Sequence, residues 1–86
     1  MEIKKEVYLR EIGGEYVLIP VGKTVDEFNG MFNLTPAGAA IFKSIQDGKD
    51  ESGILTDLLE SFEVDEDTAE KDIAEFLEKL RDYGII

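Results

Sequence analysis

Two apolar-rich runs near the start of the chain, 7–12 and 15–20, are separated by the glycine pair Gly13-Gly14. Paired glycines supply the positive φ angles that a two-residue hairpin turn requires, so the runs are predicted to form a β-hairpin. With the turn at these glycines, Leu9 lies opposite Leu18. The residues expected on the core face of this hairpin are Val7, Leu9, Tyr16 and Leu18.

The apolar spacing changes from a strand pattern to a helical one close to residue 35. The segment 21–30 is polar and rich in turn-forming residues, so we expect an extended loop there, followed by a third short strand at Met31–Leu34. Thr35 and Pro36 then predict a helix start, because a Thr hydroxyl can cap free amides and proline at the first helical position loses no needed donor.

Three helices are predicted after this point. The first runs to about Gln46 and ends at Gly48; its small residues near Gly38 indicate close contact with a neighbouring backbone, since glycine in a helix interior costs about 1 kcal/mol relative to alanine. The second opens at Asp50 or Glu51 and the third is capped by Asp65 and ends at Gly84. The apolar positions at helical spacing are Ile54, Leu55, Leu58, Leu59 and Phe62 in the second helix, and Ala69, Ile73, Phe76, Leu77 and Leu80 in the third.

The predicted order is three strands followed by three helices. We therefore expect an α+β fold, a winged helix-turn-helix-like arrangement in which a three-stranded antiparallel sheet precedes a three-helix bundle. The length of 86 residues and the absence of repeats predict one domain spanning residues 1–86.

The chain contains neither cysteine nor histidine. This composition excludes disulfides, the usual zinc and haem sites, and Cys–His nucleophiles. The sequence also lacks a calcium loop, a phosphate-binding loop and a dinucleotide-binding glycine motif. We expect a protein that is not an enzyme and holds no metal or cofactor. Because neither a signal peptide nor an apolar run near 18 residues is present, we expect a cytoplasmic protein without a membrane span.

The net charge of −11 is concentrated in the second half of the chain. Residues 1–49 hold seven acids and six bases, whereas residues 50–86 hold thirteen acids and three bases. This surface serves either to keep a small protein soluble or to attract a basic partner. DNA binding is disfavoured, because a third helix with eight acids and three bases over 65–83 repels phosphate. A carrier-protein role is disfavoured too, since no serine stands in an Asp-Ser-Leu setting.

The third strand is also a candidate binding edge for a peptide. If it lies at the sheet edge, its unpaired amides and carbonyls can accept an extended peptide as an added strand. The alternative is a plain edge strand protected by its short length.

Three segments together resemble the coenzyme PQQ synthesis protein D family. The segments are 8–22, 28–49 and 64–86. Their most specific parts are the L-x-P-x-G-A-x-I-aromatic block at Leu34–Phe42, the Asp47-Gly48 helix stop, and the D-[IV]-x-x-F-L-x-x-L-x-x-x-G-[IL] pattern at Asp72–Ile85. The resemblance covers Tyr8 to Ile86. Two departures are visible: Thr35 stands where family members commonly have asparagine, and the 21–30 loop is longer than in compact members.

The resemblance implies a non-catalytic adaptor of ribosomal peptide modification pathways. Such proteins hold the leader segment of a precursor peptide between strand 3 and helix 3 and present it to a modifying enzyme, often a radical S-adenosylmethionine (SAM) enzyme. The backbone edge carried over by position is Gly30, Met31, Phe32, Asn33 and Leu34. The acidity of the third helix further predicts a basic leader peptide. The alternative from another class is a structural or regulatory module that forms a homodimer through the same sheet edge.

A helical wheel narrows the second wall of this groove to one of two flanks of the third helix. With Ile73 and Leu80 facing the core, one flank carries Glu70, Leu77 and Arg81. The other flank, which we expect to line the groove because it mixes aromatic and oppositely charged side chains, carries Asp72, Phe76, Lys79 and Tyr83. The alternatives are core packing for the two aromatic residues and plain surface exposure for the two charged ones.

Overall fold

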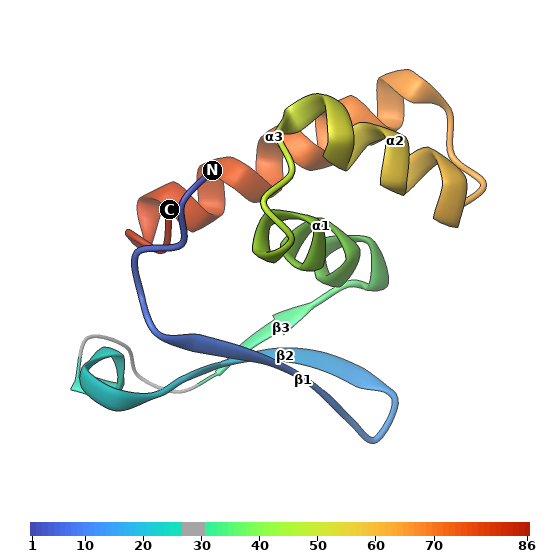
Figure 1. The fold of residues 1–86 in the computed structure, drawn as a ribbon. Coiled ribbons are helices and arrows are strands. Elements are labelled where there is room, and N and C mark those ends of the chain that lie inside the picture. Colours follow the sequence, from blue (N-terminus) through green and yellow to red (C-terminus); the bar gives the residue numbers. More distant parts are fainter. Residues whose placement is uncertain (27–30) are drawn as a thin grey trace.

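The computed structural model describes residues 1–26 and 31–86. Its three-stranded antiparallel sheet lies against a layer of three helices, with α1 between the sheet and the α2–α3 pair (Figure 1). The predicted α+β class and the order of three strands followed by three helices are confirmed. The elements are β1 (Val7–Ile12), β2 (Glu15–Pro20), the short 3₁₀ helix η1 (Gly22–Asp26), β3 (Phe32–Leu34), α1 (Pro36–Gln46), α2 (Glu51–Ser61) and α3 (Glu66–Asp82).

The hairpin forms with the predicted turn and register. Gly13 and Gly14 have φ angles of 60° and 84°, the left-handed region that favours glycine, and Leu9 pairs with Leu18. Leu18 is 1% exposed and belongs to the core, while Leu9 packs against the core from the same face. Tyr16, also expected on the core side, is half-buried, and the Lys43 ammonium lies 5.8 Å from its ring centroid.

Two predictions about the connection to β3 need correction. Residues 22–26 form η1 rather than an extended loop, and β3 begins at Phe32, one residue later than expected. The turn is held to the start of β1, since the Val21 amide donates to the Glu6 carbonyl at 3.0 Å and the Glu6 amide donates to the Thr24 hydroxyl at 2.9 Å. The rest of the predicted loop, 27–30, lies outside the described residues.

The first and third helices begin directly after their predicted caps, Thr35 and Asp65, and α2 begins at Glu51, within the predicted start. Thr35 and Asp50 accept hydrogen bonds from the amides of Gly38 and Gly53, at 3.0 and 2.9 Å. Asp65 occupies the N-cap of α3, and the side chain of Thr68 holds the pKa of its carboxyl below the ordinary range. A capping side chain satisfies amides that the first helical turn leaves free, so Thr35 and Asp50 fix where α1 and α2 start, whereas Asp65 makes no such hydrogen bond to the first turn of α3.

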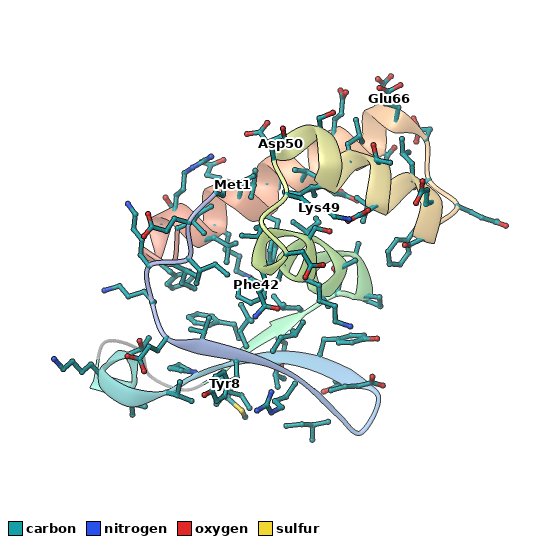
Figure 2. The ribbon with its side chains drawn as sticks, in the orientation of Figure 1. Met1, Tyr8, Phe42, Lys49, Asp50 and Glu66 are labelled. Atoms are coloured by element: carbon teal, nitrogen blue, oxygen red, sulfur yellow. The ribbon has the colours of Figure 1, made fainter. Side chains whose placement is uncertain are left out.

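The core fills the space between the inner face of the sheet and the helices. Phe42 of α1 lies at its centre with no exposed surface, pointing toward the sheet, whereas Tyr8 lies on the other side of the sheet, away from the helices (Figure 2). Leu59 departs from expectation because it is 37% exposed, although it shares the helical spacing of the buried residues of α2. The two chain ends meet beside α3, where the Lys4 amide donates to the Ile85 carbonyl at 2.6 Å (Figure 1).

Candidate functional site

The strand β3 forms one edge of the sheet. The strand order is β1-β2-β3, and β3 pairs antiparallel with β2 through Leu18↔Phe32, Val17↔Asn33 and Tyr16↔Leu34. Within the described residues no strand pairs with the opposite side of β3. The outer side of β1 is open in the same way, so the sheet presents two edges with backbone groups available to a further strand.

The end of β3 is fixed by the start of α1. The Thr35 side chain, immediately after the strand, caps the helix, and Pro36 occupies the first helical position. Gly38 follows in the first turn, and a Cβ atom placed on it would lie 3.3 Å from Cε1 of Phe76 in α3. Gly38 is therefore tightly packed, but its close neighbour is the aromatic ring of Phe76 and not the backbone that the sequence predicted.

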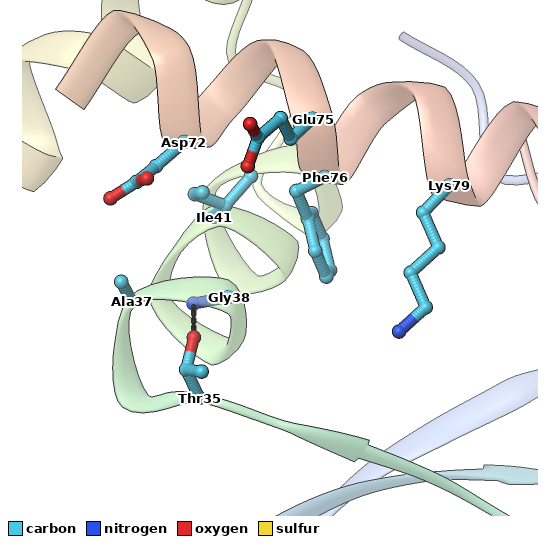
Figure 3. Close-up of a pocket in the computed structure, with 8 residues that line it drawn as sticks. All are labelled: Thr35, Ala37, Gly38, Ile41, Asp72, Glu75, Phe76 and Lys79. Carbon is cyan, nitrogen blue, oxygen red and sulfur yellow. Dashed lines mark hydrogen bonds between the residues drawn. The ribbon is translucent and has the colours of Figure 1, made fainter. Parts of the chain in front are cut away.

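A groove of about 420 Å³ lies between the first turns of α1 and one flank of α3 (Figure 3). Phe76 projects from α3 toward α1 and forms part of its apolar surface. The lining residues are Thr35, Ala37, Gly38, Ile41, Asp72, Glu75, Phe76 and Lys79. The groove thus lies next to the open backbone groups of β3, on the same surface of the molecule.

An aromatic pair links β3 to the last turn of α3. The ring centroids of Phe32 and Tyr83 are 4.5 Å apart with an interplanar angle of 53°, a tilted arrangement that aromatic pairs favour. Tyr83 is nevertheless 41% exposed, and Met31, just before β3, is 59% exposed. This end of the edge strand therefore carries apolar side chains that the fold leaves in contact with solvent.

The structure brings most of the sequence-predicted site residues to one side of the molecule. Phe32, Asn33 and Leu34 form β3; Asp72, Phe76 and Lys79 line the groove; Tyr83 contacts Phe32. Met31 precedes the strand, and Gly30 lies outside the described residues. That these residues bind a peptide stays a prediction.

Five residues of the groove were not singled out as site residues from the sequence: Thr35, Ala37, Gly38, Ile41 and Glu75. The small side chains of the first helix were a usable signal, because a glycine tolerated inside a helix indicates a close neighbour. Nothing in the sequence identified that neighbour as the third helix.

The opposite flank of α3 faces α2. Leu77 is buried there, and with Leu55, Ile73 and Ala74 it contributes to a second groove of about 470 Å³ whose rim includes Glu51, Ser52, Glu70 and Arg81. The two flanks separated by the helical wheel therefore face different neighbours. The flank with Asp72 and Phe76 is the one turned toward α1 and the end of β3.

A polar cluster at the α1–α2 connection lies outside both grooves. The Asp57 carboxylate accepts hydrogen bonds from the Lys49 ammonium at 2.6 Å and the Ser44 hydroxyl at 2.8 Å, and these bonds lower its pKa. The same contact raises the pKa of Lys49. None of the three lines the groove beside β3, so we assign the cluster to joining the two helices.

Within residues 1–26 and 31–86, no group of three carboxylate side chains is arranged to hold a metal ion. Over the same residues, the longest helices are too short or too polar to span a bilayer.

Two solved structures resemble the whole chain. The structure of TbiB1 in complex with the TbiA(beta) leader peptide is 26% identical, with a TM-score of 0.75, and the match covers 99% of this chain and 93% of that one. Lasso peptide synthetase B1 complexed with the leader peptide is 21% identical, with a TM-score of 0.74, over 98% of this chain and 93% of that one. At 21% identity, the likeness to lasso peptide synthetase B1 shows a shared fold alone. Among curated protein sequences, none matches the chain.

The family assignment comes from the sequence itself. The family model for coenzyme PQQ synthesis protein D (PqqD) matches residues 15–86, from the second strand of the hairpin through the end of α3. This range contains β3, the capped start of α1 and the groove-lining flank of α3. The chain therefore belongs to the coenzyme PQQ synthesis protein D (PqqD) family.

Proposed function

We propose that this protein binds the leader segment of a precursor peptide as an added strand along β3 and presents the remainder of that peptide to a modifying enzyme. The observation that carries the proposal is the adjacency of an open strand edge and an apolar groove. Main-chain hydrogen bonds along a strand edge can align any extended peptide and contribute to its affinity, and side-chain pockets beside the edge add both affinity and specificity.

The likeness to TbiB1 supports the same proposal. That protein binds a leader peptide, and it shares 26% of its residues and the whole fold with this chain. The exposed Met31 and Tyr83 add apolar surface at one end of the edge, where a peptide side chain can be buried.

The proposed role is that of a non-catalytic adaptor. The chain has no histidine or cysteine for nucleophilic chemistry, and binding alone is enough to help a modifying enzyme. A leader held beside the enzyme raises the effective concentration of the attached core segment, which short flexible tethers bring to about the millimolar range. A radical SAM enzyme is the partner class that the family resemblance favours.

The excess of acidic residues favours a basic leader. With ten of the eleven net negative charges in residues 50–86, the helical layer attracts cations over a range set by ionic strength. Leader association is expected to slow as salt rises from about 10 mM to about 500 mM, since the Debye length falls from about 30 Å to a few Å. The association rate constant can be measured by stopped-flow fluorescence. If it does not change with salt, electrostatic attraction of the leader is not part of the mechanism.

Backbone amide shifts in ¹⁵N-labelled protein test the binding site. Short peptides encoded beside the gene are titrated in, and shifts are expected at residues 31–34 and 72–83. Shifts confined to 7–12 would instead assign the peptide to the free edge of β1. Absence of binding, together with a stable dimer that protects 31–34, would favour the homodimeric module.

Methylated peptides test strand addition separately from groove binding. In an added strand, alternate amides face β3 and the others face solvent. Methylating the peptide nitrogens that face β3 is expected to abolish binding. Methylating the nitrogens that face solvent is expected to change the affinity by no more than about twofold, because no hydrogen bond to the protein is lost. Equal losses for both sets would contradict strand addition while leaving binding in the groove intact.

A further inference from the structure

The charged side chains of the groove are sorted along its length. On α3, the carboxylates of Asp72 and Glu75 lie on one side of the Phe76 ring, and the ammonium group of Lys79 lies on the other (Figure 3). The groove therefore has an anionic end and a cationic end, separated by an aromatic ring.

These three charges are not neutralised by other described residues. Within the described residues, no hydrogen bond or ion pair is made by the side chains of Asp72, Glu75 or Lys79, whereas the side chains of Lys49 and Asp57 pair with each other at 2.6 Å. Asp72 is half-buried, and Glu75 and Lys79 are exposed. Charges that border an apolar cleft without a partner in the fold remain available to a ligand.

The position of each end relative to β3 follows from its neighbours. Asp72 lies over Ala37, just past the carboxyl end of the strand (Figure 3). Lys79 is one helical turn before Tyr83, whose ring contacts Phe32 at the amino end of the strand. From its start to its end, β3 therefore runs from the cationic end of the groove to the anionic end.

We propose that this sorting selects leader peptides by the order of their charges: a basic residue first, and an acidic residue later in the sequence. The inference rests on the proposed function, because it takes the leader to be a strand beside β3. We take that strand as antiparallel, since the existing sheet is entirely antiparallel and antiparallel pairing is the more stable form. An antiparallel peptide enters at Asp72 and leaves at Lys79.

The spacing between the two peptide charges follows from helix and strand geometry. Asp72 and Lys79 are seven residues apart, which corresponds to about 10 Å along the helix. An extended strand covers that distance in about three residues, and side chains on one face recur every second residue. The basic and acidic residues of the leader are therefore expected two or four positions apart.

A displayed library of random twelve-residue peptides provides a defined probe. The library is selected on the wild-type protein, and the peptides retained are expected to carry the basic residue before the acidic one at that spacing. One selected peptide is then synthesised together with a copy in which its basic and acidic residues are exchanged. The wild type is expected to bind the original about tenfold more tightly than the exchanged copy.

The matching protein variant exchanges the groove charges without altering the net charge of −11. In Asp72→Lys with Lys79→Asp, the preference between the two peptides is expected to reverse. The control makes the same kind of exchange on the flank that faces α2, Glu70→Arg with Arg81→Glu, and is expected to keep the wild-type preference. If the double exchange does not fold, the single variant Lys79→Glu replaces it, because this position is exposed. It is expected to weaken binding of the original peptide.

The outcomes separate this inference from the proposed function. Some selected peptides could shift the amides of 31–34 and yet bind the wild type and the exchange variant equally well in either charge order. That result would overturn the charge-order inference but would leave leader binding standing. Selected peptides that leave those amides unshifted, or a library that yields no binder, would overturn the proposed function as well. A reversed order in the wild-type selection would overturn the antiparallel arrangement.

Discussion

Replacing Thr35 by valine should destabilise the protein by an amount that the structure allows us to state in advance. Thr35 is exposed, so valine keeps its shape and branching without opening a cavity. What the substitution removes is the acceptor for the Gly38 amide, at present 3.0 Å away. Loss of a capping side chain costs about 1 kcal/mol, within a range of about 0.5–2 kcal/mol. For a chain of this size, 1 kcal/mol lowers the melting temperature by about 4–8 °C.

Thermal melts followed by circular dichroism, with urea titrations at 25 °C, measure this effect. Thr35→Asn is the matched control, because asparagine also caps helices and is expected to keep stability within about 0.5 kcal/mol of wild type. The slope of the urea transition should be unchanged, since the same surface unfolds in every variant. The reasoning fails if Thr35→Val melts within about 1 °C of wild type, or if Thr35→Asn loses as much stability as the valine variant.

Three further perturbations probe the groove, the polar cluster and the core. Gly38→Val places its added carbons against Phe76, where a Cβ alone would already approach to 3.3 Å, so leader affinity measured by calorimetry should fall about tenfold or more; unchanged affinity would mean that the peptide lies elsewhere. The lowered pKa of Asp57 means that its ionised form stabilises the fold above the ordinary aspartate pKa of about 3.9, and that this contribution is lost as pH falls through the lowered value. Asp57→Asn should therefore lower the urea midpoint at neutral pH more than at about pH 2.5, and an equal loss at both would contradict the assignment. Phe42→Ala should cost about 3–5 kcal/mol, because the ring has no exposed surface, and a urea midpoint close to wild type would contradict its central place in the core.

Local chemistry made much of the fold predictable. The glycine pair determined the hairpin register down to Leu9 opposite Leu18, and Thr35 with Pro36 determined where α1 begins. In each case the relevant interactions join residues close in sequence, so side-chain chemistry and spacing are sufficient. The groove-lining flank of α3 was predicted in the same way, since a wheel places Asp72, Phe76, Lys79 and Tyr83 on one flank, and the first three of these line the groove.

The features that could not be predicted from the sequence depend on contacts between distant segments. A wheel gives the angle of Leu59 around α2 but not the extent of the neighbouring helix, and the side chain is 37% exposed. Likewise, Glu75 lies outside the predicted set because only the approach of α1 makes it part of the groove. The helix η1 was missed because its start is held by a contact to Glu6, fifteen or more residues away.

If a leader binds along β3 as proposed, the short length of this strand indicates which part of the leader supplies the binding energy. Three residues of strand offer about two or three main-chain hydrogen bonds, each worth about 0.5–1.5 kcal/mol net, while ordering each peptide residue costs about 1–2 kcal/mol. Micromolar affinity requires about 8 kcal/mol, so main-chain bonds alone cannot hold the peptide. Apolar side chains buried against Ile41 and Phe76 can contribute about 1.5–3 kcal/mol each. We therefore expect alanine at such an anchor of the leader to weaken binding by up to about a hundredfold, and a single amide-to-ester change, which removes one donor, by less than about tenfold. The opposite ranking in a titration would assign the affinity to the strand edge rather than to the groove.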